Sequence, residues 1–128
     1  MKRRESIDRP KFGEIWMCNL PNKDNSVQKG RRPVFIISND KNNTYAPTVN
    51  VIPLTSSKTK KRIPVHVAID NYRECGLSAP STMLVEQIMT VSQDDLYAYI
   101  GKIDDEAIMN QVYSAMSIQF PIARRATC

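Results

Sequence analysis

The stretch from Ser26 to Asp40, SVQKGRRPVFIISND, decides how the rest of the chain is interpreted, because a polar basic loop meets a strand-forming run there. Pro33 to Ser38, PVFIIS, is almost continuously apolar, and this pattern predicts a strand buried on both faces. Pro33 also restricts Arg32 to an extended backbone, so the Arg32 guanidinium leaves the chain from a defined point. A planar guanidinium in that position can take a phosphate bidentately, whereas the alternative is an ordinary surface salt bridge.

Composition and charge favour one basic globular domain. The chain has 128 residues, a hydrophobic fraction of 41%, a net charge of +5 and a pI of about 9.2. A domain of this size leaves no room for two independent cores. The longest apolar run is far short of a membrane span, and the first ten residues, MKRRESIDRP, are too charged for a signal peptide, so we expect a cytoplasmic protein.

The positive charge points to a polyanionic partner. Lys and Arg gather at residues 2–4, 29–32, 58–62 and 124–125, and the two inner clusters are placed to form one basic surface. Such a balance favours RNA or DNA as a ligand. The alternative is a solvated face that serves solubility alone.

The cysteine and histidine content argues against metal or disulfide chemistry. The chain has an odd number of cysteines, and their spacing is not that of metal ligands: they are Cys18, Cys75 and Cys128. His66 is the only histidine. These residues support neither a zinc cluster nor a disulfide framework, so we expect reduced thiols and no cofactor.

Alternation and turn residues predict an antiparallel β fold. The expected strands are residues 13–20, 33–38, 49–56, 63–69, 82–91 and 97–103. Pro53 marks the third of them as an edge or bulged strand, and residues 39–48 are interpreted as turns. Ser92 and Asp95 resemble a capping box for one short helical turn.

The spacing of the apolar residues changes from strand-like to helical near the end of the chain. Ile108, Val112 and Ala115 have helical spacing, and acidic residues precede them, which predicts a helix over about 105–118. Five or six short strands and a closing helix favour a small antiparallel barrel. Residues 1–10 are interpreted as a charged leader, 11–120 as the single domain and 121–128 as a tail.

Several polar residues lie where they could contact a ligand. Thr55 ends an expected strand just before the basic cluster of Lys58, so its hydroxyl could donate to a phosphate, although an exposed strand threonine is the alternative. His66 could be a general base, but a strand histidine with a local hydrogen bond is favoured. In a strand, Glu86 and Gln87 would face opposite sides, and either could be a buried structural hydrogen bonder.

The ordered blocks GEIWMCNL, GRRPVFIISND, NVIPLTS, PVHVAI and LVEQIMTV together resemble the MazF/PemK toxins of bacterial toxin–antitoxin modules. The resemblance implies an SH3-like barrel of the CcdB/PemK type with a C-terminal helix, assembled as a homodimer. It implies a sequence-specific endoribonuclease that cleaves single-stranded RNA without a metal, leaving a 2′,3′-cyclic phosphate and a 5′-OH. It also implies a MazE-like antitoxin with an acidic C-terminal segment, and DNA binding by the toxin–antitoxin complex.

The resemblance assigns roles to individual positions. Arg32 and Thr55 match the catalytic pair of the family. The expected RNA contacts are Ser26, Gln28, Lys29, Arg31, Lys58 and Gln87. Val27 and Lys29 depart from the family's usual loop, so the recognised RNA sequence is not implied.

Two other functions fit the same fold. A CcdB-like toxin would bind DNA gyrase and cleave nothing, and a basic barrel could bind RNA without catalysis. The arginine before Pro33, together with Thr55, favours the endoribonuclease, because the gyrase-binding relatives lack that pair.

Overall fold

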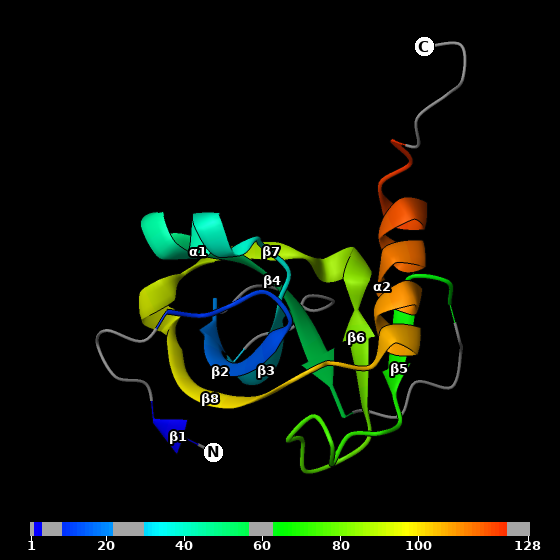
Figure 1. The fold of residues 1–128 in the computed structure, drawn as a ribbon, viewed down its shortest axis with the longest axis horizontal. Coiled ribbons are helices and arrows are strands. Elements are labelled where there is room, and N and C mark those ends of the chain that lie inside the picture. The colour runs from blue at the N-terminus through cyan, green and yellow to red at the C-terminus, as the bar shows by residue number, and fades with distance from the viewer. Residues whose placement is uncertain (1, 4–8, 22–29, 57–62, 123–128) are drawn as a thin grey trace.

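The structure is a computed structural model that describes residues 2–3, 9–21, 30–56 and 63–122. Its elements are β1 (Lys2–Arg3), β2 (Glu14–Leu20), β3 (Gly30–Ile36), α1 (Asp40–Tyr45), β4 (Thr48–Thr55), β5 (His66–Ile69), β6 (Ser81–Leu84), the 3₁₀ turn η1 (Val85–Gln87), β7 (Met89–Ser92), the 3₁₀ turn η2 (Gln93–Asp95), β8 (Leu96–Lys102) and α2 (Glu106–Gln119). Figure 1 shows the strands curled into a compact body, with α2 standing beside β5 and β6.

The strands form one antiparallel sheet in the order β1-β8-β2-β3-β4-β6-β5, and β7 also pairs with β4. The curl of β8, β2, β3 and β4 gives a barrel-like shape (Figure 1), although the path of hydrogen-bonded strands does not close on itself. The expected small antiparallel β fold with a C-terminal helix is therefore confirmed.

Alternating side chains build two cores on opposite faces of the same strands. In β3, Phe35 belongs to the core that packs against α2, whereas Val34 and Ile36 belong to the other core. In β2, Ile15 joins the first core and Trp16 the second. The prediction that residues 33–38 are buried on both faces is thus confirmed for Val34 to Ile36, and the strand itself begins earlier, at Gly30.

Helix α2 follows the predicted period closely. Asp105 caps it, its Oδ1 accepting from the backbone N–H groups of Ala107 at 2.8 Å and Ile108 at 3.2 Å. Ile108, Val112 and Ala115 are buried against the sheet. No helix within the described ranges is long and apolar enough to cross a membrane.

The expected single strand over residues 82–91 is wrong. The chain forms β6, turns through η1 and continues as β7, and both strands pair with β4. β7 pairs with Thr48 to Val51, whereas β6 pairs with Leu54 and Thr55. One straight strand cannot follow both halves of β4 around a strongly twisted sheet, so the turn divides it. Glu86 and Gln87 therefore lie in a turn and not on alternate faces of a strand.

Pro53 is buried inside the sheet, so of the two expected positions, an edge or a bulge, the edge is wrong. It pairs with Val34 on one side. On the other side it falls between the last pair with β7, at Val51, and the first pair with β6, at Leu54. A residue without an N–H costs least where a strand changes partners.

Three smaller expectations also need correction. Within residues 39–48, interpreted as turns, the structure has the helix α1, capped by Asn39 Oδ1 accepting from the Asn42 N–H at 2.8 Å. The strand expected from residue 63 begins at His66. The described chain has eight strands and not five or six, because the divided strand and the two-residue β1 were not anticipated. The short turn after Ser92 is confirmed as η2.

Candidate functional site

Arg32 lies near the start of β3, directly opposite Cys18 of β2, and its side chain is half-buried. The extended backbone expected before Pro33 is present, since both residues belong to the β3 ladder. Side chains alternate along a strand, so Arg32 shares a sheet face with Val34, whose side chain is fully buried. The guanidinium thus extends from the rim of a packed core.

Thr55 is the last residue of β4 and is only 3% exposed. It pairs with Thr82 of β6, which holds its backbone in the ladder on that side. The alternative of an exposed strand threonine is therefore wrong. A buried hydroxyl at a strand end has a fixed position, which is the property that a catalytic donor needs.

The register of β3 and β4 relates these two residues. The ladder runs from Ile36↔Val51 to Val34↔Pro53. Arg32 lies two residues beyond Val34, and Thr55 lies two residues beyond Pro53. Both side chains therefore leave the same face of the sheet at the same open end of this ladder. The sheet thus brings Arg32 and Thr55 to one face and one end, although 22 intervening residues separate them in sequence.

His66 and Glu86 form a half-buried pair near this face. His66 pairs with Leu84 along β5 and β6, and its Nε2 lies 3.0 Å from Glu86 Oε2 of η1. The two side chains are 15% and 29% exposed, and within the described residues the buried His66 Nδ1 and Glu86 Oε1 have no hydrogen-bond partner. The predicted strand histidine with a local hydrogen bond is confirmed. Gln87 ends the same turn and is half-buried.

Arg31 differs from its neighbour in position. It is exposed, lies opposite Asn19 of β2, and leaves the opposite face of β3 from Arg32. Its Cζ lies 5.7 Å from the centre of the Tyr97 ring of β8. Sequence reasoning did not identify Tyr97, because the contact depends on how β8 aligns with β2. Of the other expected RNA contacts, Ser26, Gln28, Lys29 and Lys58 lie outside the described residues.

The cysteines in the described chain, Cys18 and Cys75, are free and buried, as expected for reduced thiols. Burial, and secondarily the charge of Asp95, raises the pKa of the Cys18 thiol to about 12. Burial likewise raises the pKa of Cys75, followed by the charges of nearby carboxylates. Neither thiol is activated as a nucleophile. Over the same residues, no group of three or more His, Cys, Asp or Glu side chains is placed to hold a metal ion.

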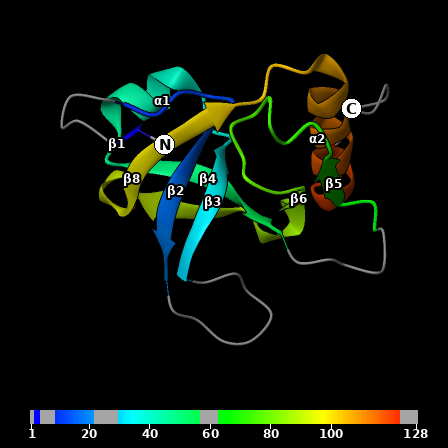
Figure 2. The ribbon, with the colours of Figure 1, turned by 90° about the horizontal axis from the view of Figure 1, so that it is seen from below.

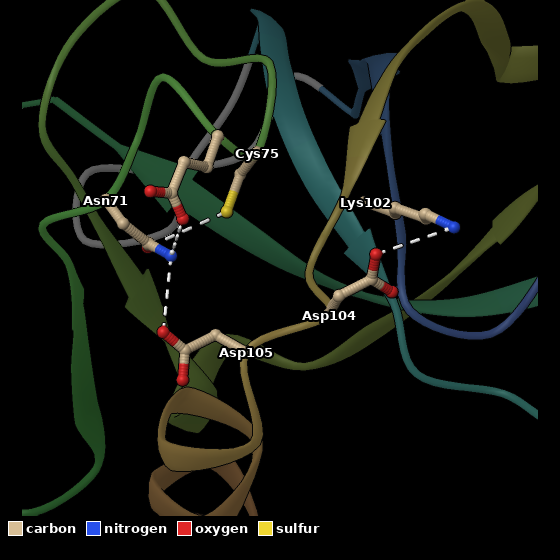
Figure 3. Close-up of a pocket in the computed structure, with 6 residues that line it drawn as sticks. Asn71, Cys75, Lys102, Asp104 and Asp105 are labelled. Carbon is tan, nitrogen blue, oxygen red and sulfur yellow. Dashed lines mark hydrogen bonds and ion pairs between the residues drawn. The ribbon is translucent and has the colours of Figure 1, made fainter.

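A polar pocket of about 290 Å³ lies between the turn at residues 71–76 and the junction of β8 with α2 (Figure 3). Asn71 Nδ2 donates to Glu74 and to Asp105, each at 3.3 Å. Lys102 and Asp104 form an exposed ion pair at 3.5 Å. Carboxylates dominate the lining and would repel phosphate, so this pocket does not suit a nucleic acid.

The antiparallel sheet and the C-terminal helix define a small barrel-like protein, and the sheet holds Arg32 and Thr55 on one face. This is the class of protein expected from the sequence. The model of the family described as "PemK-like, MazF-like toxin of type II toxin-antitoxin system" matches residues 11–120. The chain belongs to that family.

Individual relatives agree with this placement. The chain is 36% identical over 112 residues to the protein named "Endoribonuclease EndoA" of Bacillus subtilis (strain 168), covering 88% of this chain and 95% of that protein. A mycobacterial endoribonuclease solved in complex with its cognate antitoxin is 25% identical, with a TM-score of 0.69 over 91% of this chain and 99% of that one. MazF from Deinococcus radiodurans shares the fold at 16% identity, with a TM-score of 0.74 over 90% of this chain and 99% of that one.

Proposed function

We propose that the protein is the toxin of a type II toxin–antitoxin module and acts as a sequence-specific endoribonuclease on single-stranded RNA. Family membership and the 36% identity to a protein named as an endoribonuclease support this proposal. The observation that carries it is the common position of Arg32 and Thr55, on one sheet face at the open end of the β3–β4 ladder.

In the proposed reaction the ribose 2′-oxygen loses its proton and attacks the adjacent phosphorus. A new 2′-O–P bond forms as the P–O5′ bond breaks, and the leaving 5′-oxygen gains a proton. The products are a 2′,3′-cyclic phosphate and a 5′-OH end. Negative charge grows on the non-bridging oxygens, so fixed donors stabilise the transition state more than the bound RNA.

Arg32 and Thr55 are the proposed donors. The Arg32 guanidinium supplies a permanent positive charge and directional N–H groups, and the buried Thr55 hydroxyl supplies one fixed hydrogen bond. Because a guanidinium gives up its proton only at a high cost, we assign charge stabilisation to Arg32 and not general-base catalysis. This chemistry does not require a metal ion, since the two side chains supply the electrostatic stabilisation.

RNA binding extends beyond the pair. We assign Gln87, in the turn that follows β6, to an RNA contact. The other assigned contacts are Ser26, Gln28, Lys29, Arg31 and Lys58. The lysines among them neutralise phosphates, so binding should weaken as the salt concentration rises.

The proposed assembly is a homodimer with an RNA groove across its interface, acting in the cytoplasm. The proposed inhibitor is an antitoxin whose extended acidic segment occupies that groove. The solved mycobacterial relative, an endoribonuclease in complex with its cognate antitoxin, supports such a partner.

Incubation of the purified protein with a long single-stranded RNA in EDTA tests this function. Discrete fragments with 5′-OH ends are expected, and sequencing those ends gives the recognised sequence. Intact RNA with inhibited gyrase supercoiling would instead indicate the CcdB-like function. Retarded but intact RNA would indicate binding without catalysis.

A further inference from the structure

A bulge in β8 directs Tyr97 toward Arg31. In the ladder between β2 and β8, Met17 pairs with Ala98 and Cys18 pairs with Leu96. The register shifts between these two pairs, so Tyr97 is an extra residue without a partner in β2. Such bulges redirect a side chain and are common near functional sites.

The contact of Tyr97 with Arg31 crosses the intervening strand. β2 lies between β3 and β8 in the sheet, and Figure 2 shows these three strands side by side. The Arg31 guanidinium nevertheless lies over the Tyr97 ring, 5.7 Å from its centre, within the range of a cation–π interaction. Tyr97 is half-buried and Arg31 is exposed, so the ring supports the guanidinium from the protein side.

Arg31 is not engaged in an ordinary salt bridge within the described residues. The ion pairs of His66 with Glu86 and of Lys102 with Asp104 do not include Arg31. The Tyr97 ring lies against one side of the guanidinium, and Arg31 is exposed. Unpaired RNA bases stack on arginine planes and on aromatic rings, and this stacking tolerates any base.

The neighbouring arginines face opposite sides of the same strand. Arg32 leaves the face that it shares with Thr55, and Arg31 leaves the other face, one residue away along β3. Because the two residues are adjacent on β3, an RNA strand held at Arg32 would bring a flanking base close to Arg31. The two arginines would then contact neighbouring parts of one RNA molecule.

We propose that Arg31, held in position by Tyr97, is a stacking subsite for an unpaired base flanking the cleaved bond. This inference rests on the proposed endoribonuclease function and adds Tyr97 as a positioning residue. It differs from simple attraction of phosphates, because a stacked plane needs arginine and not merely a positive charge.

Binding of a non-cleavable RNA tests the subsite. The probe is a fluorescent single-stranded oligonucleotide that contains the mapped cleavage site, with a 2′-deoxy sugar at the attacking position. Fluorescence anisotropy gives its affinity for the wild-type protein and for the Arg31→Lys, Tyr97→Leu and Tyr97→Phe variants. Tyr113→Leu is the control, since Tyr113 is 52% exposed on α2.

We expect Arg31→Lys and Tyr97→Leu each to weaken binding by about tenfold, and the double variant to lose little more than either. Tyr97→Phe keeps the ring and should bind like the wild type, as should the control. Replacing the flanking nucleotides one at a time with abasic sugars should reveal one position whose loss weakens wild-type binding. An abasic sugar at that position should not change the affinity of the Arg31→Lys protein.

The inference fails if Arg31→Lys binds like the wild type, or if the abasic series is the same for both proteins. Arg31 is exposed, so this variant tests the subsite without disturbing the core. Failure of the proposed function gives a different result, because the wild-type protein would then not cleave the unmodified RNA at all.

Discussion

Replacing Thr55 with valine removes one buried oxygen atom and keeps the branched shape of the side chain. Thr55 is 3% exposed and belongs to the ladder with β6, so valine fits the same space and suits a strand equally well. The substitution therefore isolates the contribution of the hydroxyl.

The expected losses in activity and stability differ in size. A donor that stabilises a developing oxyanion contributes about 3 kcal/mol, so the cleavage rate should fall about 100-fold. Loss of a hydrogen bond that serves only the fold costs about 1 kcal/mol. Domains of this size are stable by roughly 5–15 kcal/mol, so that second loss leaves the protein folded in the assay.

Single-turnover cleavage of RNA, combined with thermal unfolding, separates these effects. The matched control is Thr48→Val, the same change at the exposed start of the same strand, which should cleave like the wild type. Thr55→Val should melt within a few degrees of the wild type. A Thr55→Val rate within threefold of the wild-type rate would refute the assignment of this hydroxyl to catalysis.

Two further predictions concern the fold. Because the pKa of Cys18 is about 12 in the folded chain and about 9 when exposed, the unfolded chain loses this proton first as the pH rises. The free energy of unfolding should therefore fall above pH 9, by up to about 1.4 kcal/mol per pH unit from this group. Urea unfolding at pH 8 to 10 should show a shallower fall for Cys18→Val than for the wild type. Equal slopes of the free energy against pH for the two proteins would contradict this prediction. A Cβ at Gly101 would clash with the backbone oxygen of Cys75, so Gly101→Ala should lower the free energy of unfolding by roughly 3 kcal/mol. Gly30→Ala, where no atom lies within 4 Å but φ is +78°, should cost only about 1 kcal/mol, and equal losses would show that the close approach at Gly101 is unimportant.

The elements set by local pattern were predictable. β2 alternates between the two cores, and α2 has both a capping aspartate and a helical period, so neighbouring residues suffice to define them. The division of residues 82–91 was not predictable, because every residue there suits a strand. The break arises from the change of partner along β4, which is a property of distant residues.

The helix α1 also lacked a sequence signal. It has six residues and no apolar stripe, and local polar contacts hold it. The amide of Asn43 is buried, donating from Nδ2 to the Ser38 backbone oxygen at 2.9 Å. Such a helix depends on its tertiary surroundings and not on its own propensity.

The candidate site was predictable in identity but not in geometry. The resemblance assigned Arg32 and Thr55 to the catalytic pair and Arg31 to the RNA contacts. The burial of Thr55 and the contact with Tyr97 depend on β6 and on the bulge in β8, and neither is encoded in nearby residues. The different surroundings of Arg31 and Arg32 therefore could not be predicted from the sequence alone.

The most direct test of the proposed activity is single-turnover cleavage of a long single-stranded RNA in EDTA by the wild-type, Arg32→Ala and Arg73→Ala proteins. Arg73 is an exposed arginine on a distant turn and controls for the loss of one charge. We predict site-specific fragments with 5′-OH ends from the wild type and from Arg73→Ala, and a rate at least about 100-fold lower from Arg32→Ala. Cleavage by Arg32→Ala at close to the wild-type rate, or 5′-phosphate ends from the wild type, would contradict the proposed mechanism.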